Sequence, residues 1–189
     1  MMLALDSREA LLAARGRGEA YEVLFFWGHR PQPDGRIGPS CLSQWYAADF
    51  AIGGVRYRTA EHFMMAEKAR LFGDHGTEAR ILEALTAQDA KGLGRKVQGF
   101  AQERWTARRV ELVIRGNIAK FTQNPRLHRY LLSTSPKVLV EASPEDAVWG
   151  IGLHRDDPRA SDPGEWQGTN LLGFALMTVR DRIGGQQAG

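Results

Sequence analysis

The order of hydrophobic and polar positions predicts strands first, then helices, then a last strand, a long loop and a final helix. Segments 21–27 and 137–143 are rich in strand-forming residues. Residues 46–59 are typical of a β-hairpin that turns at Gly53-Gly54. This order predicts an α+β fold, in which several helices pack around a small, mostly antiparallel sheet, and not a regular βαβ alternation. The segments predicted as helices are 5–15, 59–74, 77–86, 86–97, 103–121, 125–132 and 170–183.

Capping residues mark the predicted starts of these helices, because their side-chain oxygens accept hydrogen bonds from the free amides of a first turn. The expected N-caps are Ser7, Thr59, Thr77, Thr86, Asn124 and Asn170.

The predicted domain boundaries are an N-terminal extension over residues 1–20, a single domain over 21–184 and a flexible tail over 185–189.

The composition is that of a soluble globular protein. Of the 189 residues, 43% are hydrophobic and 25% are charged, which is enough for one core. The single cysteine, Cys41, excludes an internal disulfide and a Cys-rich metal site. The first residues do not resemble a signal peptide and no apolar run approaches the ~20 residues of a membrane span, so we expect a cytoplasmic protein without membrane association. The net charge of +3 suits a phosphate-bearing ligand.

The helix predicted over 59–74 carries charges on a face where apolar residues are expected. Glu61, Met64, Met65 and Lys68 are spaced i, i+3, i+4, i+7 and share one side. In one interpretation Glu61 only serves the helix terminus and Lys68 extends into solvent. In the other, both charges face a cleft, where the acid transfers protons and the amine holds an anion. A carboxylate in a first helical turn is expected to stay ionised.

Three later segments could also carry chemistry. In the long loop 144–169, Asp146 and Trp149 precede glycines that allow a ligand to approach closely, although the same pattern fits a surface turn. Arg95 could bind a phosphate through two parallel hydrogen bonds, or be an ordinary surface arginine. Asn170 lies at a helix start, where anions and ribose hydroxyls can bind, but there it could also be only a cap.

Taken together, these segments resemble the NADAR superfamily, also called the YbiA-like family. The chain departs from the family pattern at Ser43-Gln44-Trp45, where members often have Ser-Asn-Phe, and at Glu61-His62, where many have Glu-Gln. Both departures could alter which base or sugar is accepted. The resemblance covers residues 23–183 and is carried, in order, by "FFWGH", "LSQWY", "TAEHFMMAEKARLFGD", "LGRKV", "KFTQNPRLHRYLL", "LVEASPEDAVWGIG" and "WQGTNLLGFALMTVR".

The resemblance implies hydrolysis of a C1′–N bond in a phosphoribosyl or ADP-ribosyl substrate, without a metal or redox cofactor. YbiA-type members are N-glycosidases that act on phosphoribosylamino-pyrimidine intermediates of riboflavin biosynthesis. Other members remove ADP-ribose from guanine in nucleic acid, and a third alternative is a non-catalytic module that binds NAD derivatives. A DNA substrate would need a basic track beside the pocket, for which Arg104, Arg108 and Arg109 are candidates. Oligomeric state is not indicated.

Site roles follow from the resemblance. Breaking a ribosyl C–N bond builds positive charge on the sugar. Glu61 is expected to activate water or stabilise that cation, and Asp146 to protonate the leaving nitrogen. Trp149 would stack on the heterocycle, while Lys68 and Arg95 hold the phosphate. Two further residues, Trp45 and Asn170, are expected to line the pocket.

Overall fold

The computed structural model describes residues 5–185, in which seven α-helices and four short strands follow the predicted order. Short 3₁₀ turns η1 (Pro39–Leu42), η2 (Pro158–Ser161) and η3 (Pro163–Glu165) lie in the connecting loops. The helices are α1 (Arg8–Gly16), α2 (Ala60–Leu71), α3 (His75–Glu83), α4 (Ala87–Gly94), α5 (Gln102–Thr122), α6 (Pro125–Ser133) and α7 (Leu171–Gly185), and the strands are β1 (Val23–Phe26), β2 (Phe50–Ile52), β3 (Val55–Tyr57) and β4 (Val138–Glu141).

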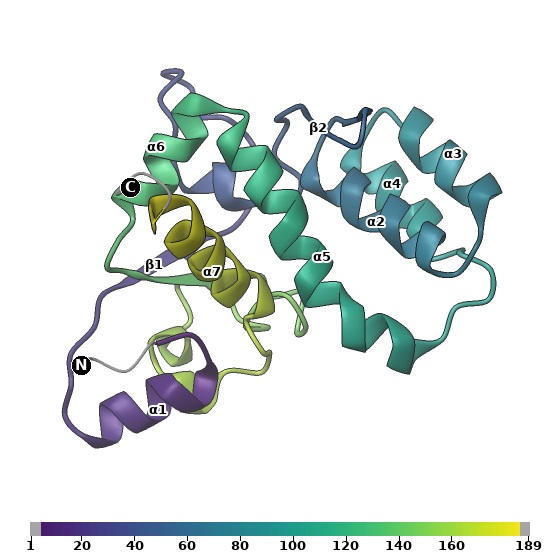
Figure 1. Cartoon of the computed structure of the whole chain (residues 1–189). Helices are drawn as coiled ribbons and strands as arrows, with labels where there is room; N and C mark the ends of the chain where they lie inside the picture. Colours follow the sequence, from purple (N-terminus) through teal and green to yellow (C-terminus); the bar gives the residue numbers. More distant parts are fainter. Residues whose placement is uncertain (1–4, 186–189) are drawn as a thin grey trace.

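The long helix α5 runs between two groups of elements (Figure 1). The helical lobe contains α2, α3, α4 and the hairpin β2–β3, and the strand lobe contains β1, β4, α6 and α7. Helix α5 packs against α2 in the helical lobe and against α7 in the strand lobe. It therefore joins the two lobes and sets the space between them.

The strands form two separate pairs. The hairpin β2–β3 is antiparallel, and Gly53 and Gly54 have positive φ angles of 60° and 80°, as a tight two-residue turn requires. Strand β1 instead pairs with β4 in parallel, with Phe26 opposite Glu141. The α+β class is confirmed, but the predicted mostly antiparallel sheet is divided in two, and the central pair is parallel. Five helices separate β1 from β4 in the chain, and this long connection permits parallel pairing.

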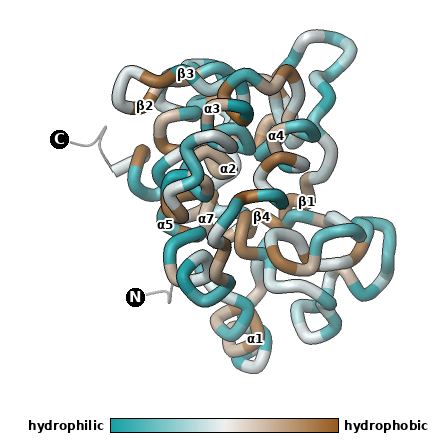
Figure 2. Tube along the Cα trace, turned by 90° about the vertical axis from the view of Figure 1, so that its right-hand side faces the viewer, coloured by the Kyte–Doolittle hydropathy of each residue, from teal (hydrophilic) through white to brown (hydrophobic). Residues whose placement is uncertain are grey.

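The hydrophobic core is centred on β4 and α7. Val138, Leu139 and Val140 of β4 are fully buried, and the pair β1–β4 is coloured hydrophobic in Figure 2. Burying one such side chain contributes roughly 1.5–3 kcal/mol. The apolar face predicted for the last helix is confirmed as a buried face of α7, formed by Leu172, Ala175, Leu176, Val179 and Ile183.

Most of the predicted helix starts are confirmed. The hydroxyl groups of Ser7, Thr59 and Thr86 accept hydrogen bonds from backbone amides of α1, α2 and α4. The prediction for Thr77 is wrong, because Asp74 caps α3 and accepts the Thr77 amide at 3.0 Å. Asp74 lies three residues after the end of α2 at Leu71, so α3 begins sooner than the threonine suggested.

The N-terminal helix is held by the long loop. Arg8 of α1 donates hydrogen bonds to the carbonyls of Pro163 at 2.6 Å and Gly164 at 2.9 Å. Residues 1–4 and residues 186–189 of the predicted tail lie outside the described part of the chain. Across residues 5–185, the structure contains no helix with the length and apolar character needed to cross a membrane.

Candidate active site

A cavity of about 740 Å³ lies between the two lobes and is lined by residues of both. Its walls come from α2 and α4 on the helical side, and from the end of β4 and the loop 143–149 on the strand side, with α5 completing them. A second cavity of about 670 Å³ adjoins it. The residues that line both cavities are Trp45, Lys91, Arg95 and Glu145.

The predicted charged face of α2 does form one wall. Glu61, Met64, Met65 and Lys68 all line the larger cavity. Helix α4 packs closely here, because a Cβ atom on Gly94 would overlap the Met65 sulfur. The interpretation that places both charges in a cleft with methionines therefore agrees with the structure.

Glu61 is almost completely buried, with 2% of its surface exposed, and its Oε1 has no hydrogen-bond partner among the described residues. Burial raises the pKa of Glu61 to about 7, although the positive charge of Lys91 and an interaction with Trp45 oppose the rise. The expectation that the helix terminus keeps Glu61 ionised does not hold, because the loss of water outweighs the helix dipole. A carboxyl group with this pKa exists in both protonation states near neutral pH, which suits proton transfer.

The Lys68 ammonium is held inside the cavity. Its Nζ donates to the Gly94 carbonyl at 2.8 Å and lies 4.3 Å from the centre of the Phe100 ring and 5.7 Å from that of Trp105. Burial lowers the pKa of Lys68, while the nearby Glu61 opposes this change. An ammonium has three N–H donors, so two remain for an anionic ligand.

Three further cations border the cavity. The exposed Arg95 side chain lines both cavities, as does Lys91, whose Nζ lies 5.5 Å from the centre of the Trp45 ring. The Arg109 guanidinium lies 5.9 Å from the centre of the Trp149 ring, and its buried Nε has no hydrogen-bond partner among the described residues. Lys91 was not predicted as a site residue, although it lies one helical turn before Arg95, the residue that directly follows α4.

The loop 143–149 is both a structural turn and a cavity wall. Asp146 Oδ1 accepts hydrogen bonds from the amides of Val148 at 2.9 Å and Trp149 at 2.7 Å. This turn places the half-buried Trp149 side chain at the cavity, which Asp146 also lines. One oxygen of the Asp146 carboxyl group is therefore engaged in shaping the loop.

The position of Trp45 is set by a buried lysine on α5. Lys120 is fully buried and donates hydrogen bonds to the carbonyls of Cys41 at 2.7 Å and Ser43 at 2.8 Å. Burial lowers the pKa of Lys120 to about 8. These bonds fasten the η1 segment to α5 and bring Trp45, two residues further on, to the point where the two cavities meet.

Asn170 does not line the cavity, so this prediction is wrong. Its side chain is fully buried and bridges to β4, where Oδ1 accepts the Glu141 amide at 2.9 Å and Nδ2 donates to the Leu139 carbonyl at 3.0 Å. Its φ of 52° is left-handed, a conformation that asparagine tolerates better than most residues. Asn170 thus fastens the start of α7 to the central strand, and its side chain is not exposed in the cavity.

Glu141, which sequence analysis left unassigned, also lines the cavity. It ends β4, and its buried Oε2 has no hydrogen-bond partner among the described residues. Burial, together with the negative charges of Asp146 and Glu61, raises the pKa of Glu141 to about 8. The feature of the sequence that could have identified Glu141 is a carboxylate at the end of a strand that is otherwise buried.

No cluster of three or more His, Cys, Asp or Glu side chains suited to a metal ion occurs within residues 5–185.

The fold and the matched sequence place the chain in the NADAR domain family, whose family model matches residues 25–184. The chain is 38% identical over 168 residues to N-glycosidase R617 of Acanthamoeba polyphaga mimivirus, covering 86% of this chain and 97% of that protein. It is 28% identical over 142 residues to N-glycosidase YbiA of Escherichia coli (strain K12), covering 75% of this chain and 80% of YbiA. The NMR structure of E. coli YbiA matches with a TM-score of 0.70 at 25% identity and covers 88% of each chain.

A third relative is much longer than this chain. It is riboflavin biosynthesis protein VVA0006 of Vibrio vulnificus (strain YJ016), which is 32% identical over 152 residues, covering 80% of this chain and 37% of that protein. The resemblance inferred from the ordered motifs is thus confirmed, and so is the YbiA-like fold.

Proposed function

We propose that the chain is an N-glycosidase that hydrolyses the C1′–N bond between ribose 5-phosphate and an aminopyrimidine of the kind formed early in riboflavin biosynthesis. The reaction class is supported by the family membership and by relatives named N-glycosidase. The relative named for riboflavin biosynthesis supports the class of substrate. The observation that carries the proposal is the buried Glu61 carboxyl group, which faces a cavity that also contains cations and Trp149.

Glu61 is assigned to the water side of the reaction. Cleavage of the C1′–N bond builds positive charge on the ribose, which a nearby carboxylate stabilises. In its ionised form Glu61 takes a proton from the attacking water, while the water oxygen bonds to C1′. The departing nitrogen keeps the electron pair of the broken bond and gains a proton, so the products are ribose 5-phosphate and the free aminopyrimidine.

The cations and the tryptophan orient the substrate. A phosphate dianion is repelled by the carboxyl groups, so it binds towards α4, where Lys91 and Arg95 line the cavity with Lys68 beside them. The flat pyrimidine stacks on Trp149, whose ring also lies close to the Arg109 guanidinium. The ribose then lies between these two ends and presents C1′ to Glu61.

The direct test is to incubate the purified protein with the phosphoribosylamino-pyrimidine and to measure free ribose 5-phosphate. The Glu61→Gln variant is expected to lose about 10²–10⁴ in rate, because proton transfer from water then lacks its base. Failure of the wild-type protein to release ribose 5-phosphate would reject this substrate class.

A second candidate is removal of ADP-ribose from guanine in DNA, and the adjoining cavity favours it. ADP-ribose extends ribose 5-phosphate by a second phosphate and an adenosine, and therefore needs more room. The second cavity offers about 670 Å³ lined in part by Lys91, Arg95 and Lys96. A third alternative, binding of NAD derivatives without catalysis, predicts tight ADP-ribose binding with no turnover.

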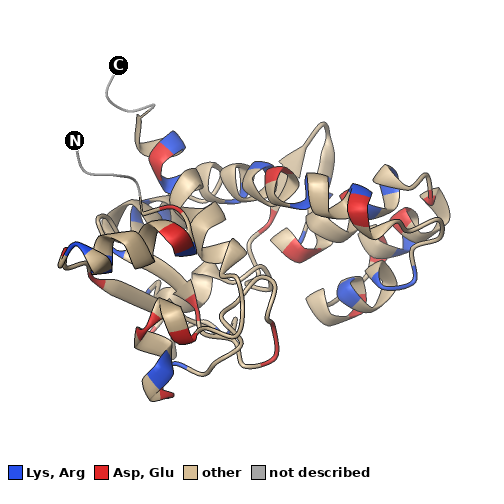
Figure 3. Cartoon of the chain, turned by 90° about the horizontal axis from the view of Figure 1, so that it is seen from below, with Lys and Arg blue, Asp and Glu red and all other residues tan. Residues whose placement is uncertain are grey.

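The charge pattern favours a small substrate over DNA. Basic and acidic residues are interspersed in both lobes in the view of Figure 3. The three arginines considered as a DNA track are engaged separately: Arg104 lies over the Phe72 ring, Arg108 is 3.5 Å from Glu111, and Arg109 faces the cavity. The two candidate substrates are separated by offering the protein an ADP-ribosylated oligonucleotide and, in parallel, the phosphoribosylamino-pyrimidine at several salt concentrations. Binding of a DNA substrate should weaken steeply with added salt.

A further inference from the structure

Two carboxyl groups, each with one buried oxygen, reach the cavity from different lobes. Glu61 extends from α2 in the helical lobe, and Glu141 from the end of β4 in the strand lobe. Each has one buried oxygen without a hydrogen-bond partner in the described part of the chain: Oε1 of Glu61 and Oε2 of Glu141. A group bound between them would supply the missing partners, and glycosidases commonly place two carboxyl groups on either side of the bond they cleave.

Asp146 is less suited to donate a proton to a substrate. Its Oδ1 already accepts two backbone amides, those of Val148 and Trp149. Proton transfer requires a group free to form a hydrogen bond with the reacting atom. The geometry gives Asp146 a clear alternative role, which is to hold Trp149 at the cavity wall.

We propose that Glu141 is the catalytic acid that protonates the leaving nitrogen, and that Asp146 is a positioning residue for Trp149. The proposal rests on the N-glycosidase function proposed above and replaces the sequence-based role of Asp146. In the reaction, the C1′–N bond breaks and the nitrogen takes the proton of Glu141, while Glu61 takes a proton from the water that bonds to C1′. Solvent then returns a proton to Glu141 and removes one from Glu61, so the cycle closes.

The protonation state of Glu141 supports this assignment. Burial, with the negative charges of Asp146 and Glu61, raises its pKa to about 8, so it carries a proton at neutral pH. Lys91 opposes the rise. Other groups that line the cavity also influence any pH profile. They are His29, Lys68, Arg95, Arg109 and Glu145.

The test compares kcat/KM across a pH series for the wild type, Glu141→Gln and Asp146→Asn on the phosphoribosylamino-pyrimidine. The wild-type rate is expected to fall as the pH rises through about 8, where Glu141 loses its proton. Glu141→Gln should lose about 10²–10⁴ in kcat and lack this alkaline decline, while its KM stays unchanged. Asp146→Asn should keep an alkaline decline, moved to lower pH because the variant lacks the negative charge that helps to raise the Glu141 pKa. It should also raise KM, because Trp149 is less firmly placed.

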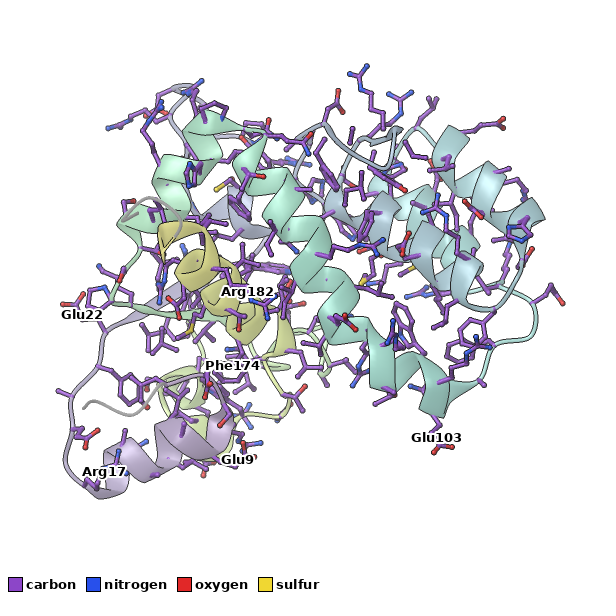
Figure 4. All side chains as sticks on the ribbon, viewed as in Figure 1. Glu9, Arg17, Glu22, Glu103, Phe174 and Arg182 are labelled. Carbon is purple, nitrogen blue, oxygen red and sulfur yellow. The ribbon has the colours of Figure 1, made fainter. Side chains whose placement is uncertain are left out.

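The matched control is Glu22→Gln. Glu22 precedes β1, lies 3.1 Å from Lys137 and has 74% of its side chain exposed, and Figure 4 shows it at the edge of the strand lobe, away from the helical lobe. This variant should keep the wild-type rate and pH profile. If Glu141→Gln does not fold, Glu141→Asp replaces it, because a shorter carboxyl group should keep the alkaline decline at a reduced rate.

The outcomes separate the two proposals. A wild-type protein that releases no ribose 5-phosphate overturns the substrate assignment itself. An active wild type with a fully active Glu141→Gln overturns only the role of Glu141. A slow Glu141→Gln that still shows the alkaline decline, or a Glu141→Asp without it, also overturns that role.

Discussion

Replacement of Glu61 by glutamine should stabilise the protein at alkaline pH while removing activity. In the unfolded chain the carboxyl group is charged above its ordinary pKa of 4.5, whereas the folded protein buries it and raises its pKa to about 7. Folding therefore becomes less favourable as the pH rises from about 4.5 to about 7, and the penalty stays constant above that range. Glutamine carries no charge at any pH and avoids this penalty.

The magnitude follows from the two pKa values. A rise of the Glu61 pKa from 4.5 to about 7 corresponds to about 3 kcal/mol of lost stability once the group is ionised in both states. Near pH 5 only a small part of this penalty is present, because the folded protein still holds the proton. The gain from Glu61→Gln should therefore be less than about 1 kcal/mol near pH 5 and about 3 kcal/mol near pH 9.

The assay is urea unfolding of both proteins at the two pH values, with the free energy of unfolding extrapolated to water. The difference between the two pH values removes any packing effect of glutamine that does not depend on pH. Glu22→Gln, which alters an exposed carboxyl group, should show no such gain. An equal effect of Glu61→Gln at both pH values, or a larger one at low pH, would refute the reasoning about the buried carboxyl group.

Three further predictions concern residues that position the site. Lys120→Met leaves the carbonyls of Cys41 and Ser43 without their donor, and should lower the unfolding free energy by about 2 kcal/mol in urea titrations. Gly94→Ala introduces a Cβ against Met65, which should destabilise the protein by about 1–3 kcal/mol. Because the added Cβ also moves α4, the variant should bind ribose 5-phosphate more weakly in calorimetry. An unchanged affinity would contradict this prediction. Asn170→Ala removes two bonds to β4, and should lower the melting temperature through a loss of about 2 kcal/mol; an unchanged melting temperature would argue against it.

Local chemistry made many elements predictable from the sequence. Thr59 supplies the cap of α2 within its own first turn, and Gly53 with Gly54 accepts the positive φ angles of the hairpin turn. The period of α2 put Glu61 and Lys68 on one face before any contact was known. The ordered motifs also identified the family correctly. Each of these inferences depends on residues only a few positions apart, or on segments compared one at a time.

The roles of the acidic and amide side chains required the tertiary structure. Asp146 and Asn170 both looked like ligand-binding residues, but they form hydrogen bonds with nearby loop amides and with the distant strand β4, respectively. Glu141 became a candidate only when the parallel pairing of β1 with β4, and α2 opposite, enclosed it in the cavity. The ionisation of a carboxyl group depends on the water it loses and the charges it meets, and for Glu61 and Glu141 those surroundings come from segments far away in the chain.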